Sequence, residues 1–365
     1  MFRTPLRPPA LAALLLLVLA VAWVPVAHAA TVGGLYSAVV SVADRSAAES
    51  ERGVARALAV VLKKVTGRSD ILDAAAGRAL LGNAQRYVTV IGHEAGGNDV
   101  DGWRLRVDFD ARAVAGALRE RGVVLWGQQR PQTYAWILLD DADGRRFVPD
   151  EKYPELREAV DAQAVERAIP LARGGVDPAL AAGLASLPAE ELLTALVGDA
   201  APPAETPASP TPVVASPVQP PKLGGVLSST DGLAWQGRWR IVIDGEVTEF
   251  ETTGDSPHAA ATAGIERAAD ALGAHFANPA VFGGVVAAFA LTVQGVQSAG
   301  DYGRAFSLLR GLDTVTALGV QRVTGHEVLF QVSARGGLPA VAESLRLTST
   351  LLPVADAPAT YVLAH

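Results

Sequence analysis

The residues best suited to chemistry lie in one short segment with the sequence Trp-Gly-Gln-Gln-Arg-Pro, residues 126–131. A guanidinium beside an indole can bind an anion or stack on an aromatic ring. The same residue types also suit a turn, in which glycine adopts an unusual backbone angle and proline stiffens the following strand. We expect a structural role for Trp126, Gly127, Arg130 and Pro131, with the charged head of Arg130 in water. A binding site at these residues is the alternative.

An acidic stretch, residues 140–144 with the sequence Asp-Asp-Ala-Asp-Gly, resembles the first half of a calcium-binding loop. The full pattern needs glycine at the sixth position and a bidentate glutamate at the twelfth. Counted from Asp141, those positions hold Arg146 and Lys152. The stretch therefore predicts an acidic turn between two strands and no metal site.

The remaining polar residues predict no catalytic, cofactor-binding or metal-binding site. The histidines beyond residue 29 are His93, His258, His275, His326 and His365. No two of them have the spacing of metal ligands on one helix face, and the sequence contains no Gly-x-Ser-x-Gly or Walker motif. The paired acids at 190–191 and at 99 and 101 are expected in solvent. Tyr302, Trp235 and Trp239 have the spacing of packed residues.

Charge and cysteine content exclude several classes of protein. The 365 residues carry a net charge of −7, so the chain repels nucleic acid and anionic lipid headgroups. The absence of cysteine excludes disulfides, thiolate metal sites, a cysteine nucleophile and a lipid-modified N-terminal cysteine. Half of the residues are hydrophobic, which is enough for two or three cores.

The first 29 residues have the three regions of a cleavable signal peptide. Arg3 and Arg7 supply a positive region, and residues 10–24 are an uninterrupted apolar run. The run is shorter than the roughly 20 residues of a membrane-spanning helix, and Ala27-His28-Ala29 fits signal peptidase. We therefore predict cleavage after Ala29, export to the periplasm and no integral membrane span, with an uncleaved anchor as the alternative.

An uncharged stretch, residues 276–300, with a strongly apolar part at 281–293, raises the question of another membrane segment. Valine and phenylalanine dominate the apolar part, and the pairs Asn278-Pro279 and Gly283-Gly284 interrupt the stretch. β-branched residues between such turn signals favour a buried strand.

Periodicity predicts an α+β fold in which helices pack on antiparallel sheets. We divide the chain into a signal peptide (1–29), an N-terminal α+β domain (30–147), a middle α+β domain (148–278) and a C-terminal domain (279–365). The middle domain includes a Pro-rich linker or insert at residues 200–221, which contain eight prolines.

The N-terminal domain is predicted as a β-α-α-β-β-α-β unit. Its expected elements are strands at 35–42, 87–91, 103–109 and 133–140, with helices opened by Ser46 and Asp110 and a short helix at 72–82. The middle domain is expected to contain helices at 153–168 and 178–197, a hairpin at 233–250 and a helix opened by Ser256-Pro257.

The C-terminal domain is predicted as a ferredoxin-like βαββαβ unit. The expected elements are strands at 285–296, 314–323, 327–334 and 360–364, a helix capped by Asp301, and a helix that starts at Pro339 and carries Leu352.

Residues 122–136 are similar to the signature of family 2066 of domains of unknown function, which comprises uncharacterised exported proteins of gammaproteobacteria. The matching residues are Trp126, Gly127, Arg130, Pro131 and Trp136. Further similarity lies in the Leu-Tyr-Ser-Ala-Val-Val start, the helix end from Ala57 to Gly67, the strand end at 107–110, the pair Trp235 and Trp239, and residues 293–302. The Pro-rich segment departs from the family pattern. The resemblance implies export and supplies no activity.

Three functions compete at this point. The leading prediction is a non-enzymatic exported protein that acts through contacts with another envelope protein. The rivals are an envelope hydrolase whose acids or serines meet only in three dimensions, and a small-ligand or glycan binder that uses Trp126 and Arg130. A deep cleft with two acids, or with serine and histidine, would favour the enzyme. An exposed apolar patch without such a cleft would favour the protein-binding role.

Overall fold

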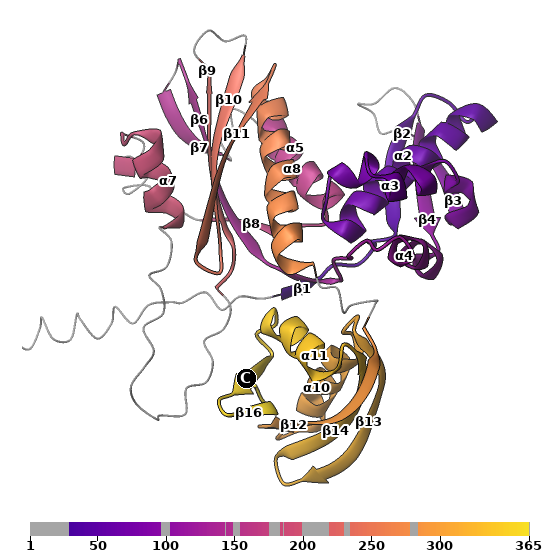
Figure 1. Ribbon diagram of the computed structural model, residues 1–365. Helices are drawn as coiled ribbons and strands as arrows, with labels where there is room; N and C mark the ends of the chain where they lie inside the picture. Colours follow the sequence, from indigo (N-terminus) through magenta and orange to yellow (C-terminus); the bar gives the residue numbers. More distant parts are fainter. Residues whose placement is uncertain are drawn as a thin grey trace, which may run out of the picture.

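The computed structural model shows an α+β protein with three larger sheets and one two-stranded ribbon (Figure 1). The described residues are 29–95, 103–142, 144–148, 154–174, 183–184, 186–198, 219–229, 234–277 and 284–364. The predicted signal peptide, apart from Ala29, and residues 200–218 of the predicted Pro-rich segment lie outside them. No helix within the described ranges combines the length and the apolar character needed to cross a membrane.

The first sheet is antiparallel and has the strand order β2 (Ser37–Val42), β4 (Trp103–Phe109), β3 (Val88–Ala95). Helices α2 (Ala47–Thr66), α3 (Ala75–Leu81) and α4 (Ala111–Arg119) accompany it, with two 3-10 turns at Asp70–Leu72 and Ala84–Tyr87. The helices cover one face of the sheet and leave β2 at its edge.

Local sequence explains the helices of this part. The Ser46 hydroxyl caps α2 by accepting the Glu49 amide hydrogen, and Asp110 caps α4 in the same way. α2 ends at Gly67, whose φ of 69° suits glycine. Apolar residues at helical spacing on α2 then pack against the strands, and Val54 and Leu58 are fully buried.

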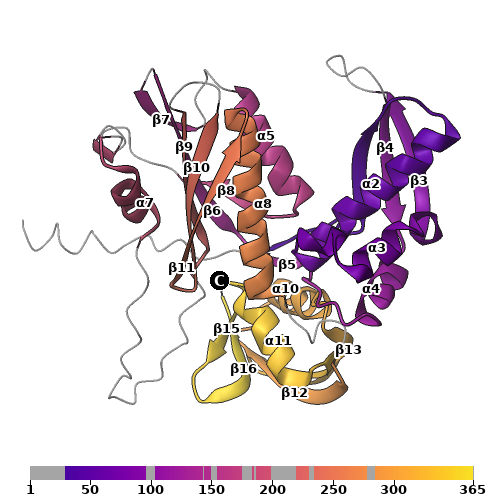
Figure 2. The same ribbon diagram turned by 45° about the horizontal axis from the view of Figure 1, so that its top comes forward.

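The second sheet runs in the order β11 (Glu246–Gly254), β10 (Trp235–Ile243), β9 (Lys222–Ser229), β6 (Thr133–Asp141), β7 (Gly144–Val148). A short strand, β8 (Leu171–Arg173), pairs with the start of β6. Helices α5 (Pro154–Glu166) and α8 (Pro257–Phe276) pack on one face, and α7 (Ala189–Val197) packs on the other (Figure 2). Ser256 caps α8, and Pro257 occupies its first turn, as the sequence predicts.

Two features of this sheet correct the sequence-based assignment. The strand expected at 133–140 in the N-terminal unit is β6, and it lies in the middle sheet with β9 parallel to it. β9 itself was not expected, because Gly224 and Gly225 interrupt its apolar pattern. A Cβ atom at Gly225 would overlap the buried Trp239 indole, which explains glycine inside a central strand. Sheet membership does not test independent folding, so the domain boundaries remain predictions.

The third sheet runs in the order β13 (Val315–Thr324), β14 (Glu327–Arg335), β12 (Val286–Gln294), β16 (Ala357–Leu363), β15 (Leu351–Val354). Helices α10 (Ala299–Arg310) and α11 (Gly337–Arg346) pack on it around a core that includes Phe330 and Val341. The apolar stretch considered as a membrane segment contributes β12, whose Leu291 and Val293 are fully buried.

The third sheet departs from the expected ferredoxin-like unit at its end. The helix predicted to carry Leu352 stops at Arg346, and Leu352 lies in β15, a strand the sequence did not indicate. β15 and β16 form a hairpin, so β16 runs parallel to β12. In a βαββαβ unit, the last strand beside β12 would be antiparallel to it. α10 is capped by the Ser298 hydroxyl, and Asp301, the expected cap, lies in its first turn.

The two-stranded ribbon pairs β1 (Ala29–Thr31) with β5 (Gln129–Pro131). β5 belongs to the Trp-Gly-Gln-Gln-Arg-Pro segment, which we call the junction segment (residues 126–131). The three larger sheets meet near this ribbon (Figure 1). The motif that the sequence singles out therefore lies between the main parts of the fold.

Candidate functional site

Arg130 of the junction segment is buried completely, with none of its surface exposed. Its Nη2 donates to the carbonyls of Lys64 (2.5 Å) and Trp126 (3.3 Å), and its Nε donates to Gly127 (3.1 Å). Its Nη1 donates to the carbonyls of Arg167 (3.0 Å) and Ala168 (3.1 Å). Five main-chain carbonyls thus account for the five N–H donors of the guanidinium.

The Trp126 indole packs against this guanidinium. The Arg130 Cζ lies 3.9 Å from the ring centroid, and Trp126 is only 2% exposed. The expectation that the charged head of Arg130 stays in water is wrong, because the ends of α2 and α5 close over it. No N–H of Arg130 is left to bind an anion, so the geometry does not favour a ligand site formed by Trp126 and Arg130. The structural role remains a prediction that mutation can test.

The junction segment also contacts the C-terminal sheet. The Gln128 main-chain N–H donates to the Asp313 carboxylate at 2.5 Å, and the Gln129 side chain donates to the Gly311 carbonyl at 2.9 Å. Burial raises the pKa of Asp313, although the Gln128 N–H and Arg130 oppose this effect. Burial, with a smaller effect of Arg167, lowers the pKa of Arg130 to about 9, so the guanidinium stays charged at neutral pH.

A second buried arginine joins α2, α5 and α8. Arg167 is fully buried, and its guanidinium contacts the carboxylates of Asp270 (2.7 Å) and Glu266 (3.1 Å) on α8. Asp270 also accepts the Ser69 amide at 2.8 Å, and Glu266 pairs with Lys63 at 3.1 Å. These contacts fix the end of the N-terminal helix α2 against the middle part of the protein.

The acidic turn between β6 and β7 has its carboxylates paired with arginines. Arg145 contacts Asp140 at 2.5 Å, and Arg146 contacts Asp141. Asp143 lies outside the described residues. Among the described residues, no group of three histidine, aspartate or glutamate side chains is arranged to hold a metal ion.

One serine–histidine contact bears on the hydrolase alternative. Ser50 Oγ of α2 lies 3.1 Å from His93 Nε2 of β3, and no sequence pattern connects these two residues. Catalysis by such a pair needs a group that orients the imidazole and donors for an oxyanion. The described residues show neither at this pair, and neither residue lines a cavity described for this protein. The contact therefore does not favour a nucleophilic site.

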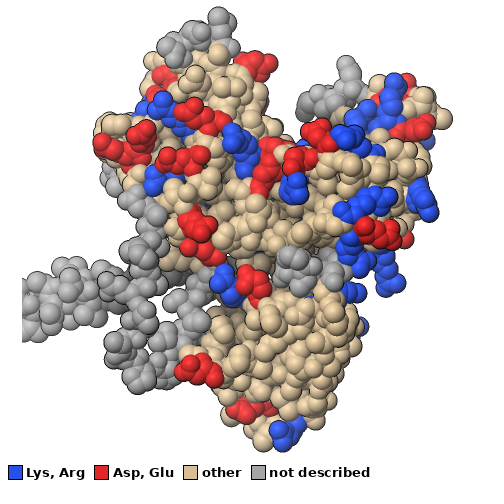
Figure 3. All heavy atoms as spheres, in the orientation of Figure 1, with Lys and Arg blue, Asp and Glu red and all other residues tan. Residues whose placement is uncertain are grey.

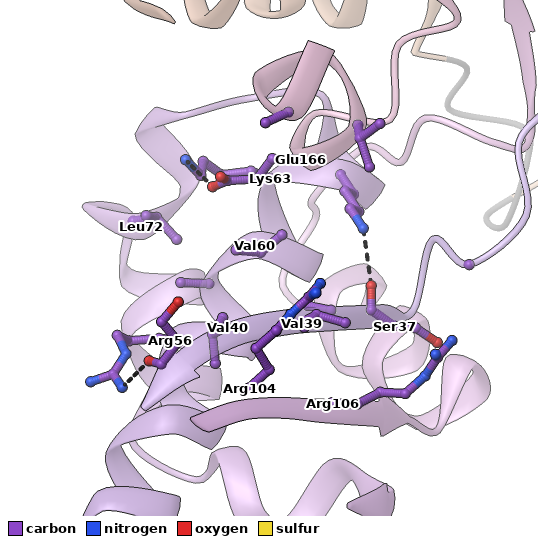
Figure 4. Close-up of a pocket in the computed structure, with 17 residues that line it drawn as sticks. Ser37, Val39, Val40, Arg56, Val60, Lys63, Leu72, Arg104, Arg106 and Glu166 are labelled. Atoms are coloured by element: carbon purple, nitrogen blue, oxygen red, sulfur yellow. Dashed lines mark hydrogen bonds and ion pairs between the residues drawn. The ribbon is translucent and has the colours of Figure 1, made fainter. Parts of the chain in front are cut away.

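A larger hollow lies between β2, α2 and α5, and we call it the β2 groove (Figure 4). Its volume is about 930 Å³, which is at the upper end for ligand sites. One wall is the edge strand β2, with Val39 and Val40. The other wall is α5, with Val165 and Glu166. Val165 is 71% exposed and Val39 is 42% exposed, so the groove offers apolar surface to a partner.

The β2 groove is cationic in a protein of net negative charge. Its basic lining residues are Arg56, Lys63, Lys64, Arg104 and Arg106, and its acidic lining residue is Glu166. Lys63 is neutralised by Glu266 and Glu166 at 3.1 and 3.6 Å. Arg56 is paired with Glu49 at 2.8 Å. Arg104 has no carboxylate partner within the described ranges, and the pair between Arg106 and Asp108 is long, at 4.0 Å. Arg104 is therefore available to an acidic partner, and Arg106 is only weakly neutralised.

Lys64 adds a further cation to the lining of the β2 groove. It is 9% exposed, and its ammonium donates to the Ser37 carbonyl at 3.0 Å. Burial lowers the pKa of Lys64, with Glu166 acting in the opposite direction. No carboxylate of the described residues lies within ion-pair distance of this ammonium, so Glu166 offsets its charge only from farther away.

A family model described as a domain of unknown function (DUF8605) matches residues 29–127. This span begins with β1, contains the whole first sheet and ends at Gly127, inside the junction segment. An uncharacterised domain is therefore supported for about a quarter of the chain. No curated protein and no solved structure gives a match.

Sequence reasoning missed the residues of the β2 groove. Arg104 and Arg106 alternate with buried Leu105 and Val107, which predicts only a strand with one solvated face. The cationic character arises because α5, about 60 residues later in the chain, packs opposite β2. The alternating Arg104 and Arg106 indicate a charged, solvated face of β4. The sequence does not indicate that α5 forms the opposite wall of the groove.

Proposed function

We propose that this protein is an exported, non-enzymatic binding protein that recognises another protein of the cell envelope through the β2 groove. The observation that carries this proposal is the cationic, partly apolar lining of the groove in an acidic chain. Exposed valines supply apolar contact area, Arg104 supplies a charge that no carboxylate of the described residues pairs with, and Arg106 supplies one whose partner Asp108 lies at 4.0 Å. The groove is open to a partner along the edge of β2.

Other surfaces support this role less well. Figure 3 shows charged side chains of both signs over the first and second sheets and few over the third. Val286 of β12 and Val323 of β13 are exposed, but the register pairs Val286 with Arg335 and Val323 with buried Val328, so the two valines lie on opposite faces of the third sheet. They form no common apolar face that would select a partner, whereas the charges of the β2 groove can select one.

The export part of the proposal is supported by the N-terminal sequence. A positive region, an apolar run and Ala27-His28-Ala29 together fit cleavage after Ala29. Residues 122–136 resemble family 2066 of exported proteins, so we propose a relationship to that family. N-terminal sequencing of the protein from a periplasmic extract tests this part. Ala30 as the first residue supports export, and intact Met1 in a membrane fraction contradicts it.

The binding role is tested by reversing the free charges of the β2 groove. The variant Arg104→Glu/Arg106→Glu is compared with Arg112→Glu/Arg121→Glu, which changes the net charge equally on exposed residues at α4. Tagged forms are cross-linked in intact cells, purified and quantified by mass spectrometry. We expect at least one envelope protein to be lost with the groove variant and retained with the α4 variant. Equal recovery with both variants would reject the β2 groove as the docking site.

A further inference from the structure

The free edge of β2 suggests how a partner is held. β2 pairs with β4 on one side only, so the main-chain groups of alternate residues point into the β2 groove. Two of these outward carbonyls are identified by their donors. Ser37 accepts from Lys64 Nζ at 3.0 Å, and Ser41 accepts from Arg56 Nη2 at 2.9 Å. Because strand residues alternate, the N–H and C=O of Val39 point the same way.

Val39 is the described residue of this edge whose outward N–H and C=O are both unbonded. Within the described part of the chain, no hydrogen bond engages its outward N–H or C=O. Edge strands are commonly blunted by charged side chains, and Lys64 and Arg56 do this on either side of Val39. Val39 and exposed Val165 of α5 both line the β2 groove.

We propose that the β2 groove binds an extended, acidic segment of the partner protein as an additional strand along β2. This inference rests on the proposed binding function and specifies the chemistry of the partner. Main-chain hydrogen bonds at Val39 supply affinity, as in other cases of strand addition. Charge selects the segment, because Arg104 has no carboxylate partner among the described residues and the Asp108 partner of Arg106 lies at 4.0 Å.

The placement of the cations fits an extended strand better than a compact anion. Arg104 and Arg106 are paired with Ser41 and Val39 across the sheet, so they lie on its outer face. Arg56 and Lys63 come from α2, on the other side of β2 (Figure 4), and they are already paired with Glu49 and with Glu266 and Glu166. Side chains of an added strand alternate between these two sides, so acids at alternate positions meet Arg104 and Arg106, and the apolar residues between them face the valines of the groove. An extended segment offers this alternation as well as charge, which a phosphate-sized anion lacks.

The inference is tested with a fluorescent, acetylated octapeptide of alternating valine and glutamate, titrated into the full-length protein. We expect this peptide to bind and the valine–lysine counterpart to show no binding. N-methylation of alternate amides removes the main-chain donors and keeps the charge. We expect that change to weaken binding about tenfold or more, as the loss of a main-chain hydrogen bond predicts.

A matched pair of variants locates the pairing at β2. Val39→Pro deletes only the outward N–H, because proline is tolerated at an edge strand when its nitrogen faces away from the ladder. Val39→Thr keeps the N–H and the β-branched shape. We expect about tenfold weaker peptide binding with Val39→Pro and unchanged binding with Val39→Thr. Thermal melts show whether Val39→Pro is folded, and the N-methylated peptide needs no altered protein.

The outcomes separate this inference from the proposed function. Equal affinity for the N-methylated and unmodified peptides would overturn strand addition, while sensitivity to Arg104→Glu/Arg106→Glu would keep the docking site. If no acidic peptide binds but recovery of the partner still depends on the two arginines, the proposal that the partner binds through an extended acidic segment is overturned. If the same envelope proteins are recovered with the parent and with Arg104→Glu/Arg106→Glu, the proposed function itself is rejected.

Discussion

Replacing Arg130 with alanine tests the structural role of the junction segment most strongly. The change removes a fully buried guanidinium and leaves five main-chain carbonyls without their donor. A buried polar group left unsatisfied costs about 1–3 kcal/mol. Water that enters the space left by the side chain can donate to some of these carbonyls and so reduces the cost. We therefore expect a loss of about 3–5 kcal/mol in the free energy of unfolding.

The measurement is urea unfolding of the parent and three variants. Arg130→Lys keeps a charge but has three donors and no planar fork, so we expect a smaller loss than with alanine. Trp126→Ala removes a packed indole and is expected to cost about 3–5 kcal/mol. Arg112→Ala, at an exposed position of α4, is the control and should stay within about 0.5 kcal/mol of the parent. An Arg130→Ala protein that is as stable as this control but inactive in cells would refute the structural role and restore the ligand-site alternative.

Three further predictions concern other parts of the fold. The hydrogen bond from Arg304, with those from Ser298 and the Gln297 amide, lowers the pKa of Asp301 to about 2. Its stabilising contribution is complete above pH 3.8 and is lost as the pH falls toward 2, so Asp301→Asn should lower the melting temperature at pH 5 and have little effect at pH 2. Gly264→Ala places a Cβ atom into the Trp239 indole and should cost about 1–3 kcal/mol by urea unfolding, whereas Gly303→Ala, where space is open, should not destabilise the protein. Limited proteolysis should cut within residues 200–218 before any strand of the third sheet, and earlier cutting at β13 or β14 would argue against the linker prediction.

Local patterns predicted the elements of this protein better than their pairing. Ser46, Asp110 and Ser256 each cap the helix that the sequence indicated, because a cap depends on a few neighbouring residues. β6 was placed with the wrong sheet because its partner β9 lies about 90 residues later in the chain. β9 was missed because its two central glycines, required by the bulk of Trp239, remove the apolar pattern of a strand.

The junction segment and the β2 groove show the same limit at the level of function. Trp126 and Arg130 stood out because a guanidinium beside an indole can bind an anion or stack on the ring. Their surroundings were not predictable, because three of the five carbonyls that accept from Arg130 come from the ends of α2 and α5. The β2 groove likewise depends on α5 packing opposite β2, a contact between segments with no shared local signal.

The most direct test of the binding role is site-specific photo-crosslinking at position 39 in living cells. Val39 is replaced by a photoreactive phenylalanine analogue, and Val323 of the third sheet, which is 62% exposed, carries the same analogue as a control. We expect a discrete adduct with one envelope protein at position 39 that disappears when Arg104→Glu/Arg106→Glu is added. An adduct at position 323 with none at position 39, or an adduct at position 39 that persists after charge reversal, would contradict the binding role.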